Sequence, residues 1–147
     1  MDNFKQTRLH PDILKAITKM GFETPTPIQA KTIPHLMASA HDLIATAQTG
    51  TGKTAAFGLP SIHLTDIEDR RTQTLVLCPT RELCMQITKD LGNFSKYING
   101  MNILAVYGGA SIQSQIKSLK KGAQIVIGTP GRTKDLIKRK RLDISHV

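Results

Sequence analysis

The chain has 147 residues, of which 39% are hydrophobic and 21% are charged, so its composition is that of a globular domain rather than a disordered chain. No apolar run approaches the length of a membrane span, and the first residues lack the apolar core of a signal peptide, so we expect a cytoplasmic protein with no membrane partner. Twenty basic residues against eleven acidic residues give a net charge of +9, which indicates a polyanionic partner.

Two helices are expected in the first forty residues. Residues 12–20 place apolar side chains on one helical face, with Pro11 suited to the first turn and Gly21 to the end. A second helical stretch begins near Thr26 and Pro27, and Pro34 is expected to kink or restart it.

The next segment, residues 47–54, has the composition of a phosphate-binding loop, Ala-Gln-Thr-Gly-Thr-Gly-Lys-Thr. Gly50 and Gly52 allow a tight turn whose backbone N–H groups point toward an anion. Lys53 is expected to bind the β- and γ-phosphates of a nucleotide, and the Thr54 hydroxyl to bind Mg²⁺. The residues that follow can open a helix, whose N-terminus adds a partial positive charge.

Short apolar runs and helical stretches alternate along the rest of the chain, which predicts an α/β layered domain. In one helical stretch, Leu83, Ile87 and Leu91 recur every four residues. The polar segment 66–73 is the expected exposed loop. The apolar runs predict strands of a parallel sheet that is covered on both faces, at residues 43–47, 74–78, 103–107 and 125–128.

The two cysteines, Cys78 and Cys84, have neither a metal-ligand nor a redox spacing. Both lie in apolar surroundings, so we expect small buried side chains rather than reactive thiols. The five histidines are scattered and form no cluster with them, so no zinc site is expected.

Four loops are expected at one edge of the sheet, because parallel strands end at the same edge and open α/β sheets bind ligands there. The first strand leads into the phosphate loop, the second into residues 79–83, the third into Gly108-Gly109 and the fourth into residues 129–132. Small residues in these loops permit close backbone approach, and their Thr and Arg side chains can contact phosphates. Each loop alone is equally compatible with a helix-capping turn.

Much of the basic excess lies late in the chain, at Lys117, Lys120, Lys121 and the block 138–141. Such a charge run is either a phosphate-binding surface or a solvated helix face. Charge alone does not distinguish the two.

The order of these motifs resembles the first RecA-like domain of the DEAD-box RNA helicases, over essentially the whole chain. Residues 21–29, Gly-Phe-Glu-Thr-Pro-Thr-Pro-Ile-Gln, are similar to the family's Q motif, and Phe4 to the aromatic residue upstream of it. Ala47 stands where the general phosphate-loop pattern has glycine, and this family's version of the loop has alanine there. Residues 79–83 resemble motif Ia, Gly108-Gly109 the glycine doublet, and residues 129–132 motif Ib.

The resemblance implies an α/β fold: a RecA-like phosphate-loop domain with a mostly parallel sheet flanked by helices, incomplete at its C-terminal end. It divides this partial domain into a Q-motif region, residues 1–30, and a phosphate-loop core, residues 42–147. It implies an ATP-dependent RNA helicase that locally unwinds or remodels RNA duplexes, with ATP and Mg²⁺ as cofactors.

The implied ATP-binding residues form two groups. In the Q motif, Gln29 would pair with the adenine edge and Phe22 would stack on the base. Thr24 would contribute a backbone carbonyl, and Phe4 would support the pocket. A hydrophobic plug for Phe22 and a helix-surface amide for Gln29 remain the alternatives. The loop group consists of Ala47, Gln48, Thr49, Gly50, Thr51, Gly52, Lys53 and Thr54, with Lys53 and Thr54 as the catalytic candidates and Thr54 as the metal ligand.

The implied RNA-binding residues would follow the backbone of single-stranded or duplex RNA with little sequence preference. The chain has only two tyrosines, four phenylalanines and no tryptophan, so base stacking is a poor candidate for the main binding force. The implied set is Pro79, Thr80, Arg81, Gly108, Gly109, Thr129, Pro130, Gly131 and Arg132.

The family's Asp-Glu-Ala-Asp run, which holds Mg²⁺ and positions the attacking water, does not occur in this sequence, nor do the Ser-Ala-Thr motif and the second RecA-like domain. We therefore expect a piece of a longer protein that binds nucleotide weakly and hydrolyses it negligibly. Strands absent from the sheet would leave backbone unpaired, so we expect marginal stability, or rescue by strand exchange or dimerisation.

Two other functions remain open. A different P-loop enzyme, such as a DNA helicase or another NTPase, would lack the adenine selectivity expected from Gln29. A non-catalytic RNA-binding fragment with a vestigial phosphate loop would not depend on Lys53 for nucleotide affinity.

Overall fold

The computed structural model describes residue 1 and residues 3–147, and the chain forms two compact units. Unit 1 consists of Met1–Leu64 and Asp90–Asn99, and unit 2 of Thr65–Lys89 and Gly100–Val147. Helix α4 (Arg81–Phe94) contributes its first residues to unit 2 and its last residues to unit 1.

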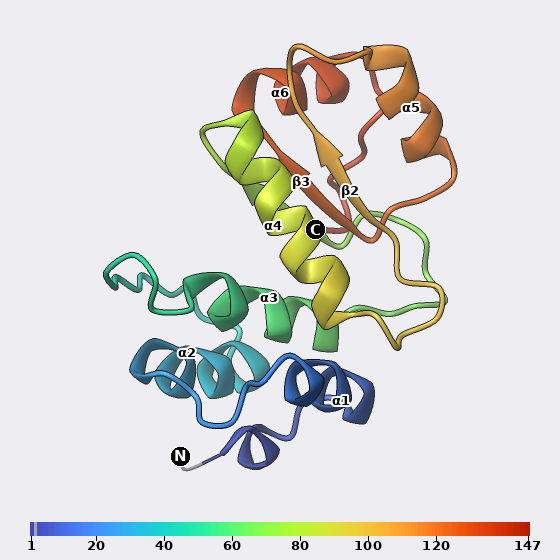
Figure 1. Ribbon diagram of the computed structural model, residues 1–147. Helices are drawn as coiled ribbons and strands as arrows, with labels where there is room; N and C mark the ends of the chain where they lie inside the picture. Colours follow the sequence, from blue (N-terminus) through green and yellow to red (C-terminus); the bar gives the residue numbers. More distant parts are fainter. Residues whose placement is uncertain (2) are drawn as a thin grey trace. The chain divides into compact units, whose positions relative to one another are not determined.

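Unit 1 is helical (Figure 1). As predicted, a helix begins with proline in its first turn and is followed by Gly21, whose φ of +87° suits a glycine after a helix end. The next helix continues through Pro34, so the predicted restart does not occur there. The elements are the 3-10 helix η1 (Phe4–Thr7), α1 (Pro11–Lys19), α2 (Pro27–Ala38) and α3 (Lys53–His63).

The core of unit 1 forms where these helices face one another. Ile17 of α1, Ile33 of α2 and Leu59 of α3 are fully buried. Gly58 allows α3 to lie close to the last turns of α4. A Cβ at this position would lie only 2.8 Å from the Leu91 Cδ1 atom. Unit 1 therefore has a packed interior of its own.

Residues 43–47 do not form the predicted strand, and this is the main correction to the sequence analysis. The Ile44 side chain is 95% exposed and Leu43 is 40% exposed. An apolar run becomes a strand only where a neighbouring strand satisfies its N–H and C=O groups, and none of the described strands pairs with this segment. Hydrophobicity predicted a strand here, but the segment stays irregular because none of the described strands pairs with it.

Unit 2 contains a parallel three-stranded sheet in the order β1-β3-β2. The strands are β1 (Thr74–Leu77), β2 (Ile103–Val106) and β3 (Ile125–Gly128), so three of the four predicted strands are confirmed. The mostly parallel, helix-flanked α/β architecture is therefore confirmed.

Helices cover both faces of this sheet. Val126 is in register with Leu75 and Leu104, and these three side chains join one core cluster with residues of α5 (Ile112–Lys120) and α6 (Pro130–Lys138). The neighbouring strand residues face the other way, toward α4, where the Cys84 Sγ donates to the carbonyl of Ile127 at 3.0 Å. This double cover explains why β3 is buried along its whole length.

Both cysteines are free and buried, as predicted. The segment 66–73 is irregular, as predicted, and four of its eight residues are exposed. Thr72 is buried, and its hydroxyl donates to the Ala123 carbonyl at 2.9 Å. Among residues 1 and 3–147, none of the helices combines the length and the apolar character that a membrane crossing requires.

Candidate nucleotide and nucleic-acid sites

The predicted phosphate loop forms a turn at the N-terminus of α3, within unit 1. Gly50 and Gly52 have φ angles of +77° and +81°, in the left-handed region that favours glycine. Gly52 is the residue before the helix, and Lys53 is its first residue. The first N–H groups of a helix have no intrahelical acceptor, so this end of α3 offers donors and a positive dipole to an anion.

Lys53 is exposed, and its Nζ donates to the carbonyl of Ala47 at 2.8 Å across the loop. The loop is further closed by the Thr51 hydroxyl, which donates to the Gln48 carbonyl at 2.6 Å. The Lys53 amine therefore lies beside the loop with which it is predicted to bind phosphates. Thr49 is exposed and Thr54 is half-buried in the first turn of the helix.

The Q motif contacts the phosphate loop directly. The Thr26 hydroxyl donates to the Thr51 carbonyl at 2.8 Å, and the Gln29 Nε2 donates to the Gly52 carbonyl at 3.1 Å. The Gln29 Oε1 accepts from the Thr26 N–H at 3.0 Å, and Gln29 is only 3% exposed. Gln29 is therefore a buried residue that holds the loop, and not the surface amide considered as the alternative.

The two predicted phenylalanines of the adenine pocket contact each other. The Phe22 ring lies 5.9 Å from the ring of Phe4 and, at a 70° angle, 5.9 Å from that of Phe94. Phe4 and Phe94 are buried, whereas Phe22 is half-buried and Thr24 is exposed. The Phe22 ring is thus packed against two other rings and is still partly accessible to solvent. Every predicted ATP-binding residue belongs to unit 1.

The predicted RNA-binding residues all belong to unit 2 and follow the carboxyl ends of its strands. Pro79-Thr80-Arg81 follows β1, Gly108-Gly109 follows β2, and residues 129–132 follow β3. Because the strands are parallel, these three loops lie at one edge of the sheet, as predicted. The fourth predicted loop, the phosphate loop, belongs to unit 1.

Two of the three loops meet through a side chain. The Arg81 guanidinium lies 4.9 Å from the centre of the Tyr107 ring, a cation–π arrangement. Gly109 has a φ of +81°, and a Cβ there would lie 3.7 Å from the Arg81 Nη1 atom. The Thr80 hydroxyl accepts from the Leu83 N–H at 3.2 Å and so caps α4.

Arg132 links the third loop to the second. Its Nη1 and Nη2 atoms donate to the Ala110 carbonyl at 3.2 and 3.1 Å, and Nη1 also donates to the Gln115 Oε1 at 2.9 Å. Gln115 in turn donates to the Tyr107 carbonyl at 3.1 Å. Thr129 is the residue before α6 and makes no side-chain cap hydrogen bond, and it is followed by Pro130 in the first turn and the exposed Gly131. The Arg132 guanidinium is thus held in place by the glycine-doublet loop.

The sequence analysis did not assign Thr26 or Gln115 to a site, and both make hydrogen bonds there. Thr26 and Gln29 have the spacing of a capping box, Thr-x-x-Gln, which would have predicted that their polar groups meet. Gln115 interrupts the apolar stripe of Ile112, Ile116 and Leu119 on one face of α5. A polar residue in a buried stripe requires hydrogen-bond partners, and that signal could have identified it.

Comparisons with known proteins agree on one family. Residues 26–147 match the family model of the DEAD/DEAH box helicases. The chain is 48% identical over 144 residues to the ATP-dependent RNA helicase DeaD of Mycobacterium tuberculosis, covering 98% of this chain and 25% of that protein. It is 52% identical over 147 residues to the ATP-dependent RNA helicase CshA of Listeria monocytogenes, covering 100% of this chain and 28% of that protein. The chain thus spans about a quarter of the length of the curated relatives that it matches.

Solved structures show the same fold. A DEAD box protein from the hyperthermophile Methanococcus jannaschii superposes with a TM-score of 0.94 and 41% identity, covering 100% of this chain and 40% of that one. Dbp5 of S. cerevisiae, solved bound to RNA and ADP BeF3, superposes with a TM-score of 0.88 and 30% identity, covering 100% of this chain and 37% of that one.

Proposed function

The chain belongs to the DEAD/DEAH box helicase family, and we propose that it is the ATP- and RNA-binding part of an ATP-dependent RNA helicase. The observation that supports this most directly is the turn at Gly50 and Gly52, which precedes the N-terminus of α3 and places Lys53 at the first helical position. The names of the relatives DeaD and CshA support the same activity.

The phosphate loop fits a nucleoside triphosphate with Mg²⁺. The exposed Lys53 amine would exchange its hydrogen bond to the Ala47 carbonyl for one to a phosphate oxygen. The Thr54 hydroxyl would be a ligand of Mg²⁺, and the first N–H groups of α3 would bind phosphate oxygens. ATP, when bound there, supplies the phosphoryl group whose transfer drives the helicase cycle.

Gln29 would select adenine while it supports the loop. Its side-chain amide has two N–H donors and an oxygen with two lone pairs, and it uses one donor on Gly52 and one lone pair on the Thr26 N–H. One donor and one lone pair are left, which is the complement of the adenine edge. The half-buried Phe22 ring would stack on the base.

RNA would bind at the carboxyl edge of the sheet in unit 2. Arg81 and Arg132 would contact backbone phosphates, while Gly109 and Gly131 would allow the RNA backbone to approach. The relative Dbp5, solved with RNA, supports RNA as the ligand. Hydrolysis by these 147 residues alone would be negligible, since the sequence contains no Asp-Glu-Ala-Asp run to hold the metal.

Nucleotide binding tests the proposal. We expect the chain to bind ATP more tightly than GTP, in a titration against a fluorescent ATP analogue. Lys53→Ala should weaken both nucleotides by about tenfold to a hundredfold, the value of a charged hydrogen bond. Gln29→Ala should reduce the ratio of ATP to GTP affinity toward one. Equal affinity of the unsubstituted chain for ATP and GTP would favour another class of P-loop NTPase, and unchanged affinity in Lys53→Ala would favour a vestigial loop.

A further inference from the structure

Most of the positive charge in unit 2 lies outside the proposed RNA loops. Unit 2 contains thirteen lysines and arginines against six aspartates and glutamates, so it holds +7 of the net charge of +9. Only Arg81 and Arg132 of those thirteen belong to the loops at the carboxyl edge of the sheet. The function proposed above leaves the remaining cations without a role.

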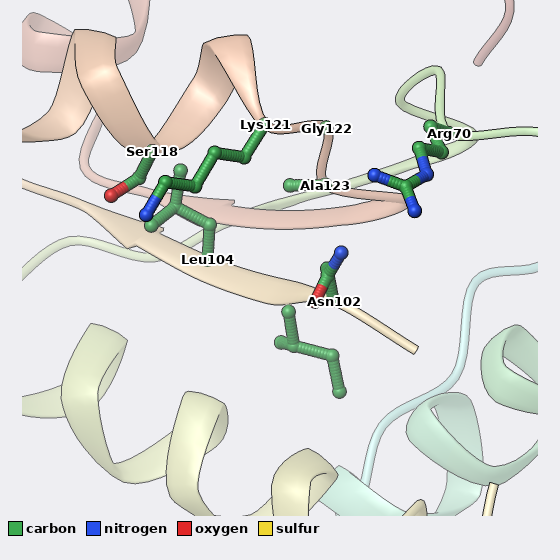
Figure 2. Close-up of a pocket in the computed structure, with 8 residues that line it drawn as sticks. Arg70, Asn102, Leu104, Ser118, Lys121, Gly122 and Ala123 are labelled. Carbon is green, nitrogen blue, oxygen red and sulfur yellow. The ribbon is translucent and has the colours of Figure 1, made fainter. Parts of the chain in front are cut away.

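A group of these cations surrounds two adjoining cavities at the opposite, amino edge of the sheet. The first cavity has a volume of about 410 Å³ and the second about 470 Å³, and both are lined by Arg70 and Lys121. Figure 2 shows Lys121 extending along Leu104 toward Ser118, with Arg70 on the other side of Ala123. The second cavity is further lined by Arg71, Lys120, Arg141 and one carboxylate, that of Asp143. We call these two cavities the amino-edge site.

A backbone turn at Gly122 brings the Arg70 segment beside the end of α5, which carries Lys120 and Lys121. Gly122, with a φ of +92°, turns the chain between α5 and β3, and a Cβ there would lie 2.8 Å from the Arg70 Cβ and 2.9 Å from its carbonyl oxygen. A residue with a side chain at position 122 would therefore push the Arg70 segment away from this turn. The segment is fixed by Thr72, whose hydroxyl donates to the Ala123 carbonyl at 2.9 Å.

A second turn directs Arg141 back toward the sheet. Lys140 adopts a φ of +56°, which is unusual for a residue other than glycine. The Arg141 N–H then donates to the Leu136 carbonyl at 2.9 Å, and Leu142 is buried in the core. Arg141 is thereby folded onto the site, whereas Lys138 stays in the last turn of α6 and lines neither cavity.

Four of the five basic side chains have no acidic partner within the part of the chain that the structure describes: Arg70, Lys120, Lys121 and Arg141 are exposed and form no ion pair there. Arg71 is paired with Asp69, at 2.6 Å between Nη2 and Oδ2, and its guanidinium also contacts His146. Like charges held together without counterions raise the local positive potential, which favours binding of a polyanion.

The lining favours RNA over an acidic protein. Protein interfaces depend on aromatic or large apolar anchors, and neither cavity is lined by an aromatic residue. The apolar residues that do line them, such as Leu104 of β2 and Leu119 of α5, are half-buried and pack against the core cluster of unit 2. A phosphodiester backbone needs only regularly placed cations and room for phosphates.

We propose that the amino-edge site binds the phosphodiester backbone of a second segment of the RNA that the carboxyl-edge loops hold. This rests on the proposed function. Each strand has four residues, so the two edges are separated by about 13 Å along the sheet. A long RNA can reach both edges, whereas a short RNA occupies only one.

Fluorescence anisotropy with labelled oligouridylates of increasing length tests this, in a KCl series from about 50 to about 200 mM. The site variant combines Arg70→Gln, Lys121→Gln and Arg141→Gln. The control variant removes the same charge from exposed lysines that line neither cavity, with Lys31→Gln, Lys89→Gln and Lys138→Gln. For long RNA, we expect the salt slope of log affinity to fall by about 2 in the site variant, about 0.7 for each lost contact, and by much less in the control. For the shortest RNA, the site variant and the control should behave alike.

Equal slopes for the site and control variants at every RNA length would overturn the proposal. So would loss of poly-L-glutamate binding in the site variant without a change in RNA binding, which would identify an acidic protein as the ligand. Arg132→Gln separates this from the proposed function, since it should weaken RNA of every length. If Arg132→Gln has no effect on any RNA, the carboxyl-edge assignment fails, whatever the site variant does.

Discussion

The Nε2 atom of Gln29 donates a hydrogen bond to the carbonyl oxygen of Gly52, at 3.1 Å. The residue that we expect to recognise adenine is therefore bonded to the loop that we expect to bind the phosphates. Its Oε1 is bonded to the Thr26 N–H in the same structure. The base recognition that we expect and the geometry of the loop would thus depend on one buried side chain.

Gln29→Ala should lower the stability of the chain even without nucleotide. The substitution leaves the Gly52 carbonyl and the Thr26 N–H without this partner, a loss of about 1–3 kcal/mol in the free energy of unfolding. Urea denaturation of the nucleotide-free chain measures it. Gln48→Ala, an exposed amide in the same loop, is the control and should change stability by about 0.5 kcal/mol or less. Equal stability of the two variants would mean that the Gln29 contacts contribute nothing to the fold.

The two loop glycines should respond differently to alanine. Both have positive φ angles, which costs about 1–2 kcal/mol for any residue with a Cβ. At Gly52 the new Cβ would also lie 2.2 Å from the Gln29 Nε2 and displace that amide, whereas at Gly50 nothing lies within 4 Å. Gly52→Ala should therefore be the more destabilising of the two.

The double variant Gln29→Ala with Gly52→Ala tests whether the extra loss in Gly52→Ala comes from the contact with the Gln29 amide. Because Gln29→Ala removes the amide that the Gly52 Cβ would strike, the two losses should sum to more than the double variant shows. Chemical denaturation of all four chains gives the coupling. Strict additivity would show that the Gly52 Cβ and the Gln29 amide do not meet.

The sequence was sufficient to predict the sheet of unit 2, because each of its strands finds a partner within the chain. Ile125 and Ile127 of β3 are fully buried, and the apolar run predicted them as such. The run at residues 43–47 is also largely apolar, yet Ile44 is 95% exposed. Periodicity reports what a segment can bury, whereas pairing depends on a second segment that local sequence does not reveal.

The candidate site was predictable to a similar degree. The residues from Ala47 to Thr54 were predicted to form a phosphate-binding loop because the motif specifies both residue types and spacing, and they do form a turn before α3. The hydrogen bonds that Gln115 accepts from Arg132 and donates to Tyr107 were not predicted, since they join residues 17 and 8 positions apart through a side chain on a buried helix face. Such contacts depend on how a helix lies against its sheet, which propensity does not determine.

Gln115→Ala should weaken RNA binding although Gln115 is only 7% exposed. The Arg132 guanidinium would lose one of its two acceptors and the Tyr107 carbonyl its donor, so the arginine would be held only by the Ala110 carbonyl. We expect severalfold weaker binding of a short oligouridylate by fluorescence anisotropy. The effect is smaller than the about tenfold or more of a whole charged hydrogen bond, because Arg132 keeps its bonds to the Ala110 carbonyl. Gln113→Ala, an exposed residue of the same helix, should bind like the unsubstituted chain. If both variants bind RNA equally well, Gln115 does not position Arg132.

The Cys84 thiol should be unreactive in the folded chain. It is fully buried, its Sγ donates to the Ile127 carbonyl at 3.0 Å, and burial, with a smaller effect of Cys78, raises its pKa from the ordinary 9.0 to about 12. The thiolate is the reactive form, so iodoacetamide at pH 8 should leave Cys84 of a Cys78→Ala chain unmodified, and should alkylate it in urea. Equal rates in the folded and unfolded chain would contradict the buried placement.

The same pKa sets the direction of a stability change with pH. The folded chain holds the Cys84 proton more tightly than the unfolded chain, so the stabilisation from the protonated thiol is complete below pH 9 and is lost as the pH rises toward 12. Cys84→Ala has no such proton, and its stability should fall less steeply over that range. Subtracting the two unfolding curves isolates the thiol from the lysines and tyrosines that titrate in the same window. If the difference in unfolding free energy between the two chains stayed constant from pH 9 to 12, Cys84 would ionise alike in the folded and unfolded states. That result would contradict the buried position of its thiol between α4 and β3.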